Sequence, residues 1–454
     1  MSRFDAKYFQ RLLKRLYNTG IRLKLKKLLK VFLSPAYFYR TEAKSTACAK
    51  EILNLQEQLD FARENCDKIR GHSKPIKVLL LINTAGTLNC FKEVYELMLS
   101  DSDFLPSIIA VPLYKENNEL DAYTYKQLIS SLAEQNISYT EGISEDLKTP
   151  LDLLSLSPDY VFYLDPYMQT YAKHQRADFM SLFARVCYIP YGYMMLDNLN
   201  NSSDTGYYNR YFHNLCWRIF CESPWHLEQF KKYQRKAGRN VLYLGYPKNA
   251  SIAFNCVTDS YWKKIKQNFK KIIIWAPHWT ISDIYSNCKS GNFDRYCKDM
   301  LDMAKRTRDV FFALRPHPNL RNGVISTGFM SGAEFDEYIS VWNSNHNAAC
   351  YIGNDYQQMF SVCDALILDS ISFIAEFVPY NKPGLYLERR DRTKLNEFGN
   401  RMLERYEKAY DFRDIERFVD EVTLEDDVSC NKITDGHLLN NDAVANICNY
   451  LKQQ

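Results

Sequence analysis

Short apolar runs alternate with amphipathic segments through the first half of this chain, from Ile76 onward. The runs predict strands at Lys77–Thr84, Ser107–Tyr114, Asp159–Asp165, Arg185–Tyr193, Arg218–Ser223 and Val241–Lys248. Apolar residues at three- and four-residue steps predict helices between several of them, for example over Phe91–Leu99. Continuous apolar strands separated by helices are typical of a parallel sheet covered on both faces. Residues 76–250 are therefore predicted to form a doubly wound, Rossmann-like domain.

The same pattern starts again near residue 251 and predicts a second domain over 251–454. Its strands are expected at Lys271–His278, Val310–Pro318, Ala365–Asp369 and Gly384–Glu388, and its helices at Phe293–Arg308, Phe335–Asn343 and Ser372–Val378. Two helices are expected in the tail, at Glu416–Val422 and Asp442–Gln453, and one of them is a candidate to cross back to the first domain. Two successive domains of this kind predict the α/β class and the GT-B arrangement, in which two doubly wound Rossmann-like domains face a cleft and ligands lie at the carboxyl ends of the strands.

The region before the first strand has a different pattern and predicts an N-terminal helical extension. Thr41–Arg70 contains no helix breaker, and its apolar positions alternate in three- and four-residue steps, so residues 35–75 are interpreted as one long helix and a linker. The heptads are weak. Packing of this helix on the body of the protein and pairing with a second copy in a homo-oligomer are both open.

Charge is concentrated at the N-terminus. Residues 1–34 carry ten Lys and Arg against Asp5 alone, a local charge of +9 in a chain whose net charge is +4, so the other residues sum to −5. Phe9, Leu12, Leu13 and Leu16 repeat at helical spacing within this segment. A basic amphipathic segment fits the surface of an anionic membrane, although it could also pack on the body with its basic face in water. The negative remainder argues against a nucleic-acid partner.

Length and composition narrow the class further. A chain of 454 residues exceeds one ordinary domain, and its 46% hydrophobic and 25% charged residues exclude collagen-like and strongly disordered proteins. The 13 Cys are odd in number and lack the spacings of a zinc site, even at Cys216 and Cys221, which favours reduced thiols in the cytoplasm and no metal site. No apolar run reaches about 18 residues, so neither a membrane-spanning helix nor a signal peptide is expected.

Candidate catalytic and binding residues follow directly after three of the predicted strands of the second domain. Trp275–Thr280 contains His278, which suits a general base or a phosphate-binding imidazole. Leu314–Asn319 contains Arg315 and His317 on either side of a proline. Arginine can bind two phosphate oxygens at once, and histidine can exchange a proton near neutral pH. The alternative for each histidine is a structural role in a turn.

The third segment, Leu368–Val378, passes from a strand into a helix. Backbone N–H groups and the hydroxyls of Ser370 and Ser372 are predicted to bind a phosphate there, because neither serine has Glu or Gln three residues later to form a capping box. Asp369 and Glu376 are candidates to contact the ribose or nucleotide of a donor. For Glu376, an exposed carboxylate near the start of a helix is an equally good interpretation.

These motifs together resemble the CDP-glycerol glycerophosphotransferase family, whose members build teichoic acids and related polyol-phosphate polymers of the cell surface. The resemblance extends over about Ile76–Lys452. It depends on Trp-Ala-Pro-His-Trp at 275–279, Arg-Pro-His-Pro at 315–318, Asp-Ser-x-Ser-x-x-x-Glu-Phe at 369–377 with Lys-Pro at 382–383, Gly-Tyr-Pro-Lys at 245–248 and Asp-Gly at 435–436. It implies a GT-B transferase bound peripherally to the inner face of the cell membrane.

The resemblance also implies the reaction. A polyol phosphate, most simply glycerol phosphate from a CDP-polyol donor, would pass to a hydroxyl of a lipid-linked glycan or polyol-phosphate acceptor, and CMP would leave. His278 and His317 would be catalytic, Arg315, Ser370 and Ser372 would hold the donor phosphates, and no cofactor would be required, although a divalent cation is compatible with the chemistry. The family's polymerases carry His-Gly at a strand end of the first domain, where this chain has Tyr191-Gly192. Tyr191 and Gly192 are therefore acceptor-side candidates, and either His278 takes the acceptor's proton or Tyr191 only binds the substrate.

Two other functions stay open at this stage. GT-B folds also serve sugar transfer from nucleotide sugars, and a fold does not determine its chemistry. An inactive scaffold held at the membrane is the third interpretation. The motifs at 315–318 and 369–372 argue against a scaffold, because it has no need of them.

Overall fold

The computed structural model describes residues 75–115, 117–197, 206–249, 260–282, 289–352, 356–424 and 442–454. The basic segment 1–34, the predicted helix Thr41–Arg70 and the Asp-Gly pair at 435–436 lie outside these residues. The described chain forms two compact units. The first contains residues 75–191, 206–244 and 444–454, and the second contains residues 192–197 and the described residues from 245 to 443.

The first unit is built around a seven-stranded sheet in the order β3-β2-β1-β4-β5-β6-β7, and every neighbouring pair is parallel. Its central strands are almost entirely apolar and buried, as expected of a sheet with both faces covered. The strands are β1 (Ile76–Ile82), β2 (Phe104–Ala110), β3 (Thr140–Glu141), β4 (Tyr160–Tyr163), β5 (Arg185–Tyr188), β6 (Arg218–Phe220) and β7 (Val241–Leu242).

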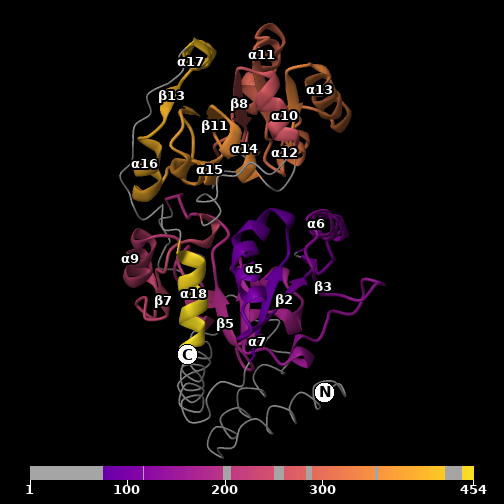
Figure 1. Cartoon of the computed structure of the whole chain (residues 1–454), viewed down its shortest axis with the longest axis vertical. Helices are drawn as coiled ribbons and strands as arrows, with labels where there is room; N and C mark the ends of the chain where they lie inside the picture. The colour runs from indigo at the N-terminus through magenta and orange to yellow at the C-terminus, as the bar shows by residue number, and fades with distance from the viewer. Residues whose placement is uncertain are drawn as a thin grey trace, which may run out of the picture. The chain divides into compact units, whose positions relative to one another are not determined.

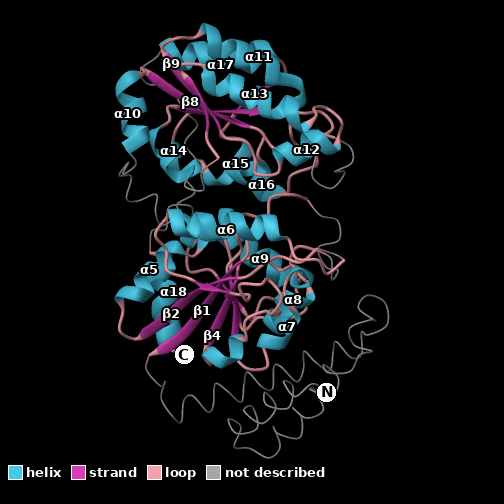
Figure 2. Cartoon of the chain, turned by 90° about the vertical axis from the view of Figure 1, so that its right-hand side faces the viewer, coloured by secondary structure: helices cyan, strands magenta, loops and turns pink. Residues whose placement is uncertain are grey.

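Helices surround this sheet, as Figures 1 and 2 show. Two of them begin at side-chain caps, because Asp121 accepts from the Thr124 N–H and Ser223 accepts from the His226 N–H. The α-helices are α5 (Lys92–Ser100), α6 (Ala122–Glu134), α7 (Ala177–Met180), α8 (Tyr211–Leu215), α9 (Pro224–Tyr233) and α18 (Ala443–Lys452), and the 3-10 helices are η1 (Ala85–Cys90), η2 (Leu153–Leu156), η3 (Met168–Thr170) and η4 (Lys173–Gln175).

The second unit repeats the plan with six parallel strands in the order β10-β9-β8-β11-β12-β13. All residues of β8, β9 and β11 are buried, which accounts for their continuous apolar sequences. The strands are β8 (Lys271–Ala276), β9 (Val310–Leu314), β10 (Ala348–Cys350), β11 (Ala365–Leu368), β12 (Gly384–Leu387) and β13 (Glu407–Ala409).

Helices also cover the second sheet (Figure 2). Helix α13 begins at a capping box in which Ser331 and Glu334 exchange side-chain and backbone hydrogen bonds, a start signal that the sequence carries locally. The helices are α10 (Ser260–Asn268), α11 (Phe293–Arg306), α12 (Leu320–Ser326), α13 (Gly332–Ser344), α14 (Tyr356–Val362), α15 (Ile371–Glu376), η7 (Val378–Tyr380), α16 (Glu397–Leu403) and α17 (Phe412–Leu424).

The two units exchange short segments, so a division at residue 250 does not describe them fully. Helix α18, at the end of the chain, belongs to the first unit. The Tyr160 hydroxyl donates to the Leu451 carbonyl over 3.4 Å, the Arg218 Nε donates to the Tyr450 hydroxyl over 2.5 Å, and Lys452 forms ion pairs with two aspartates of the first unit. Residues 192–197 belong to the second unit, where Leu196 pairs with Leu395 in an isolated antiparallel bridge.

Both sheets place their first strand beside their fourth, β1 with β4 and β8 with β11. This is the doubly wound order, in which the connections turn to opposite sides of the central strand and leave the carboxyl ends of the two middle strands open to a ligand. Two Rossmann-like domains of parallel α/β structure are thereby confirmed. The second sheet carries the strand ends at which the sequence places most candidate residues.

The described residues also bear on membrane-spanning helices, disulfides and metal sites. No helix there is both long and apolar enough to cross a bilayer. The cysteines described, which include Cys216 and Cys221, are free thiols. The same residues hold no group of three or more His, Cys, Asp or Glu side chains placed to bind a metal ion.

Candidate functional site

The carboxyl ends of β8, β9 and β11 meet at one edge of the second sheet. Leu368 of β11 pairs with Ala276 of β8, and Leu314 of β9 pairs with Trp275 of β8. In this register the three strands end beside one another, so the polar residues that follow them are neighbours in space. The residues brought together in this way are His278, Arg315, His317, Asp369 and Ser370.

Asp369 organises the loops around it and is completely buried. Its Oδ1 accepts from the backbone N–H of His278 over 2.6 Å, and its Oδ2 accepts from the backbone N–H and the side-chain Nδ2 of Asn292 over 2.5 and 3.1 Å. The Ser290 hydroxyl donates to the Asp369 carbonyl over 2.6 Å. Burial raises the pKa of Asp369 to about 7 against these hydrogen bonds, which lower it. Its carboxylate therefore binds protein groups, and the contact with the donor nucleotide predicted for Asp369 remains untested.

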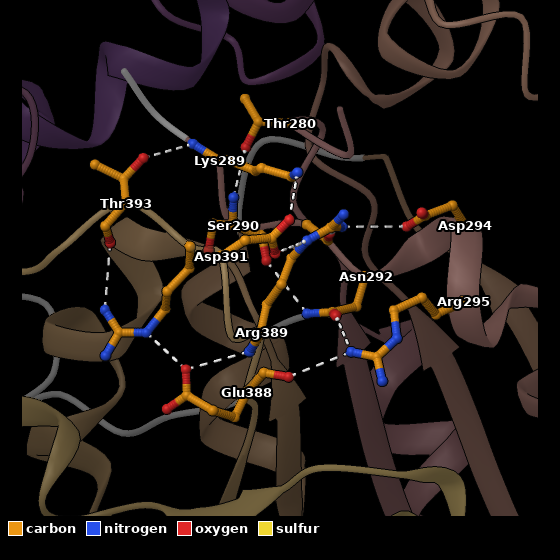
Figure 3. A network of polar contacts seen from close by, with 12 residues as sticks. Thr280, Lys289, Ser290, Asn292, Asp294, Arg295, Glu388, Arg389, Asp391 and Thr393 are labelled. Carbon is orange, nitrogen blue, oxygen red and sulfur yellow. Dashed lines mark hydrogen bonds and ion pairs between the residues drawn. The ribbon is translucent and has the colours of Figure 1, made fainter. Parts of the chain in front are cut away.

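A wider polar network connects the segment that carries Lys289, Ser290 and Asn292 to the residues after β12 (Figure 3). The Lys289 Nζ lies 2.5 Å from the Asp391 Oδ2, and Arg389 donates to Asp391 over 2.8 Å and lies 3.6 Å from Asp294. The hydrogen bonds from Lys289 and Arg389 lower the pKa of Asp391 to about 2. The backbone N–H of Lys289 also donates to the hydroxyl of Thr393 over 2.8 Å. These bonds tie the segment after β12 to the segment that carries Ser290 and Asn292.

His278 and His317 lie edge to face, with ring centroids 5.0 Å apart and ring planes inclined by 65°. In both residues the Nδ1 atom accepts a hydrogen bond from the backbone N–H two positions later. The distance is 3.4 Å from Thr280 to His278 and 3.1 Å from Asn319 to His317. A backbone N–H can only donate, so we assign Nδ1 as the unprotonated nitrogen of each ring and Nε2 as the atom that carries the proton of the neutral ring.

Both imidazoles are held in the neutral state. Burial lowers the pKa of His317, and the positive charge of Arg315 lowers it further, to about 3. Burial and the neighbouring His317 hold the pKa of His278 well below its usual value. A neutral ring with its proton on Nε2 is a hydrogen-bond donor at that atom. Of the two roles predicted for His278, general base and phosphate-binding imidazole, this arrangement of hydrogen bonds is compatible with the second, and both remain predictions.

Arg315 is a buried cation without a carboxylate partner among the described residues. Its side chain is 6% exposed, and its Nη1 donates only to the carbonyl of the next residue, Pro316, over 2.8 Å. Its Nε is buried and has no hydrogen-bond partner in the described part of the chain. Burial lowers the pKa of Arg315. A guanidinium so placed is costly unless an anion joins it.

Glu376 has partners inside the protein. Its Oε1 lies 2.8 Å from the Lys248 Nζ, and its Oε2 accepts from the Tyr356 hydroxyl over 2.5 Å. The ring of Tyr356 lies between two cations, with its centroid 5.6 Å from the Lys248 Nζ and 5.9 Å from the Arg315 Cζ. Glu376 thus forms its ion pair with Lys248, while Arg315 contacts the ring of Tyr356 and no carboxylate of the described residues. The ribose contact predicted for Glu376 remains untested, but both of its oxygens already have a protein partner.

Ser370 and Ser372 stand where α15 begins. Ser370 is the N-cap residue and is buried, yet its hydroxyl makes no capping hydrogen bond. Ser372 is half-buried in the first turn. The absence of a capping box, which the sequence predicts, is thus confirmed for Ser370, and its hydroxyl is not consumed by the helix.

Tyr191 and Gly192 lie at the point where the chain passes from the first unit to the second. The Tyr191 N–H donates to the Leu164 carbonyl over 3.1 Å, and the Cys90 thiol donates to the Tyr191 carbonyl over 3.4 Å. Gly192 opens the short segment assigned to the second unit. Their acceptor-side role stays a prediction.

Sequence reasoning did not single out several residues that shape this site. Thr280, Ser290 and Asn292 surround His278 and Asp369, while Lys248 and Tyr356 surround Glu376. The His-x-Thr spacing at 278–280 was a local signal for the first of them. Asn292 gave a weaker signal, because it stands directly before α11 without capping it by its side chain. Tyr356 carried no signal, since its contact is formed across 20 residues of sequence.

Comparison with solved structures identifies the fold. No family model and no curated protein sequence matches this chain. The wall teichoic acid polymerase TagF, solved as its H548A variant, superposes with a TM-score of 0.51 at 13% identity, covering 96% of this chain and 98% of that chain.

Epimerases of UDP-sugars share the same architecture. The S. aureus MnaA–UDP complex has a TM-score of 0.53 at 13% identity and covers 83% of this chain and 96% of that chain. The UDP-GlcNAc 2-epimerase of Methanocaldococcus jannaschii, in complex with UDP-GlcNAc and UDP, has a TM-score of 0.53 at 12% identity, covering 84% of this chain and all of that chain. At these identities the likeness concerns the fold alone. The two parallel sheets and these neighbours together establish that the chain has the GT-B fold.

Proposed function

We propose that this protein transfers a polyol phosphate from a CDP-polyol to a hydroxyl group of a cell-surface glycan or polyol-phosphate precursor. The acceptor oxygen forms a bond to the phosphorus that carries the polyol, the bond from that phosphorus to the CMP oxygen breaks, and the acceptor proton is released. Glycerol phosphate from CDP-glycerol is the simplest donor. The reaction would occur at the inner face of the cell membrane, where the basic segment 1–34 would bind anionic lipid.

The observation that carries this proposal is the uncompensated Arg315. Phosphoryl transfer needs little covalent chemistry from the protein, and catalysis consists mainly of positioning and of neutralising phosphate charge. A buried guanidinium with no carboxylate partner among the described residues, beside two imidazoles that present Nε2–H groups, is suited to a diphosphate. Binding of the diphosphate would supply the missing hydrogen-bond acceptors of Arg315.

The same geometry supports a division of roles. His278 and His317 would donate to phosphoryl oxygens, and the Ser370 hydroxyl would add a further donor. Because both rings carry their proton on Nε2, neither accepts the acceptor's proton at that atom. The base is therefore proposed to lie outside this pair, and Tyr191 is proposed to contact the acceptor.

Sugar transfer from a nucleotide sugar is the second candidate. It is supported by the solved neighbours that hold UDP or UDP-GlcNAc on the same fold. An anion site built on Arg315 would serve either donor, since both contain a diphosphate.

A donor panel separates the two candidates. The full-length protein would be incubated with CDP-glycerol, CDP-ribitol, UDP-GlcNAc and a CMP-sugar, each with lipid-linked acceptors, and the products analysed by mass spectrometry. We expect release of CMP and an acceptor heavier by one polyol phosphate. Release of UDP with an acceptor heavier by one sugar would overturn polyol-phosphate transfer in favour of the second candidate.

A matched pair of variants connects the activity to the site. Arg315→Lys keeps the charge and removes the planar fork, so we expect a rate loss of roughly 10²–10³, the scale seen when one preorganised charge-stabilising donor is deleted. Arg321→Lys is the control, because Arg321 lies on the surface of α12 in an ion pair with Asp336. Equal activities of the two variants would contradict the assignment of the donor site.

A further inference from the structure

Thr280 is the residue that distinguishes the surroundings of the two histidines. It is completely buried two positions after His278, and its Oγ1 lies 2.7 Å from the His278 Nδ1. The same oxygen accepts from the backbone N–H of Ser290 over 3.2 Å. The backbone N–H of Thr280 points at the same Nδ1 over 3.4 Å, and with Nδ1 assigned as the unprotonated nitrogen, the Thr280 hydroxyl is the donor of the 2.7 Å hydrogen bond.

Within the described part of the chain, no hydroxyl contacts the Nδ1 of His317. Its Nδ1 receives the backbone N–H of Asn319 over 3.1 Å, which is a good hydrogen bond. The corresponding backbone contact to His278 is 3.4 Å, at the limit of a useful hydrogen bond. The Thr280 hydroxyl thus gives the His278 Nδ1 a short hydrogen bond of 2.7 Å, whereas the backbone gives the His317 Nδ1 one of 3.1 Å.

The hydroxyl is itself held in place. Its acceptor side is occupied by the N–H of Ser290, whose own hydroxyl donates to the carbonyl of Asp369. The Thr280 carbonyl accepts from the N–H groups of Ser290 and Gly291 over 3.3 and 3.0 Å. Among the described residues, the His278 Nδ1 at 2.7 Å is the hydrogen-bond acceptor available to this hydroxyl proton.

We propose that Thr280 is a positioning residue that holds His278 with its proton on Nε2, so that His278 donates a hydrogen bond to a phosphoryl oxygen of the substrate. This inference builds on the proposed function, because it names what His278 does in the diphosphate site. Thr280 itself touches no reacting atom. It acts through the ring, in the way that the partner of one imidazole nitrogen sets the chemistry of the other.

The test measures the ring directly. Full-length protein labelled with ¹⁵N-histidine would be studied without substrate by NMR, in which protonated and unprotonated ring nitrogens give well-separated ¹⁵N shifts, and a His278→Gln variant assigns the signals. We expect an unprotonated Nδ1 and a protonated Nε2 in the wild type. Thr280→Ser keeps the hydroxyl and should preserve this pattern, whereas Thr280→Val should give a measurable fraction of His278 with its proton on Nδ1.

Activity gives a second readout. With the donor identified by the panel above, Thr280→Val should lose about 10- to 100-fold in kcat, the range expected when a catalytic group is misplaced slightly, and Thr280→Ser should recover most of it. Thr423→Val is the control, because the Thr423 hydroxyl donates only within its own helix, to the Val419 carbonyl.

The possible results separate this inference from the proposed function. A wild-type His278 with its proton on Nδ1, or unchanged His278 signals in Thr280→Val, would overturn the role of Thr280 whatever the activity. The expected NMR pattern together with no turnover of any CDP-polyol would leave that role standing and overturn the proposed donor. If Thr280→Val does not fold, the wild-type spectrum and the Thr280→Ser variant still decide the question.

Discussion

Replacing Arg315 by methionine should weaken anion binding without the loss of stability that usually follows from removing a large buried side chain. Methionine retains much of the aliphatic volume and removes the charge. In the protein without ligand, Arg315 is 6% exposed, donates only to its neighbour's carbonyl, and leaves Nε without an acceptor among the described residues. Its removal therefore breaks no ion pair of the described structure.

The magnitude follows from opposing contributions. An unsatisfied buried donor costs about 1–3 kcal/mol, which the substitution recovers. The loss of the contact between the guanidinium and the Tyr356 ring costs about 0.5–2 kcal/mol. The expected net change in the free energy of unfolding is therefore between about −1 and +2.5 kcal/mol, where positive means more stable. Breaking a buried ion pair would instead destabilise by about 3–5 kcal/mol.

The assay is thermal unfolding with and without CDP. A ligand present at 100 times its Kd stabilises a protein that it binds only when folded by about 2.7 kcal/mol. CDP should therefore raise the Tm of the wild type and of the surface control Arg321→Met, and should raise that of Arg315→Met much less. Two results would refute the interpretation of Arg315 as an anion-binding residue. One is a fall of several kcal/mol in the free energy of unfolding of Arg315→Met without CDP, and the other is an unchanged CDP-induced rise in its Tm.

Three further predictions concern other parts of the chain. Glu376→Gln leaves the Lys248 ammonium buried without its carboxylate and should lower the free energy of unfolding, measured by chemical denaturation, by about 3–5 kcal/mol. The double variant Lys248→Met/Glu376→Gln should recover most of this loss. Equal stabilities of the single and double variants would contradict the ion pair. The pKa of His317 is about 3 in the folded protein and about 6.5 in an unfolded chain. Between these pH values the unfolded state binds more protons, so stability falls as the pH drops below about 6.5. The Tm measured from pH 7 to pH 4 should therefore fall less in His317→Gln than in the wild type, and parallel curves would show that the ring is not held neutral. Deletion of residues 1–34 removes a local charge of +9 and should abolish salt-sensitive binding to anionic vesicles in sedimentation assays, whereas equal binding by the shortened protein would exclude this segment as the membrane contact.

The long buried strands were predictable because burial on both faces leaves its mark in every residue. Strands β8 and β9 lie within the apolar runs from which they were expected, and β1 begins one residue before its run, at Ile76. The short edge strands β3, β10 and β13 were missed. They have only two or three residues, and those of β3 are both exposed polar side chains, so only hydrogen bonding to a neighbouring strand makes them strands.

The sequence by itself determined the two-domain α/β class and the strand ends at which His278, Arg315, His317, Asp369 and Ser370 would gather. This was possible because parallel strands end at a common edge, and polar residues after an apolar run mark that edge.

Only the tertiary structure decided what these residues do there. Asp369 meets Asn292 across 77 positions and Glu376 meets Lys248 across 128, so both carboxylates have protein partners that the sequence pattern did not predict. The proton positions of the histidines likewise depend on which backbone N–H groups reach Nδ1. Hydrogen bonds act over about 3 Å, so their pairing depends on the packing of segments that a linear pattern does not place.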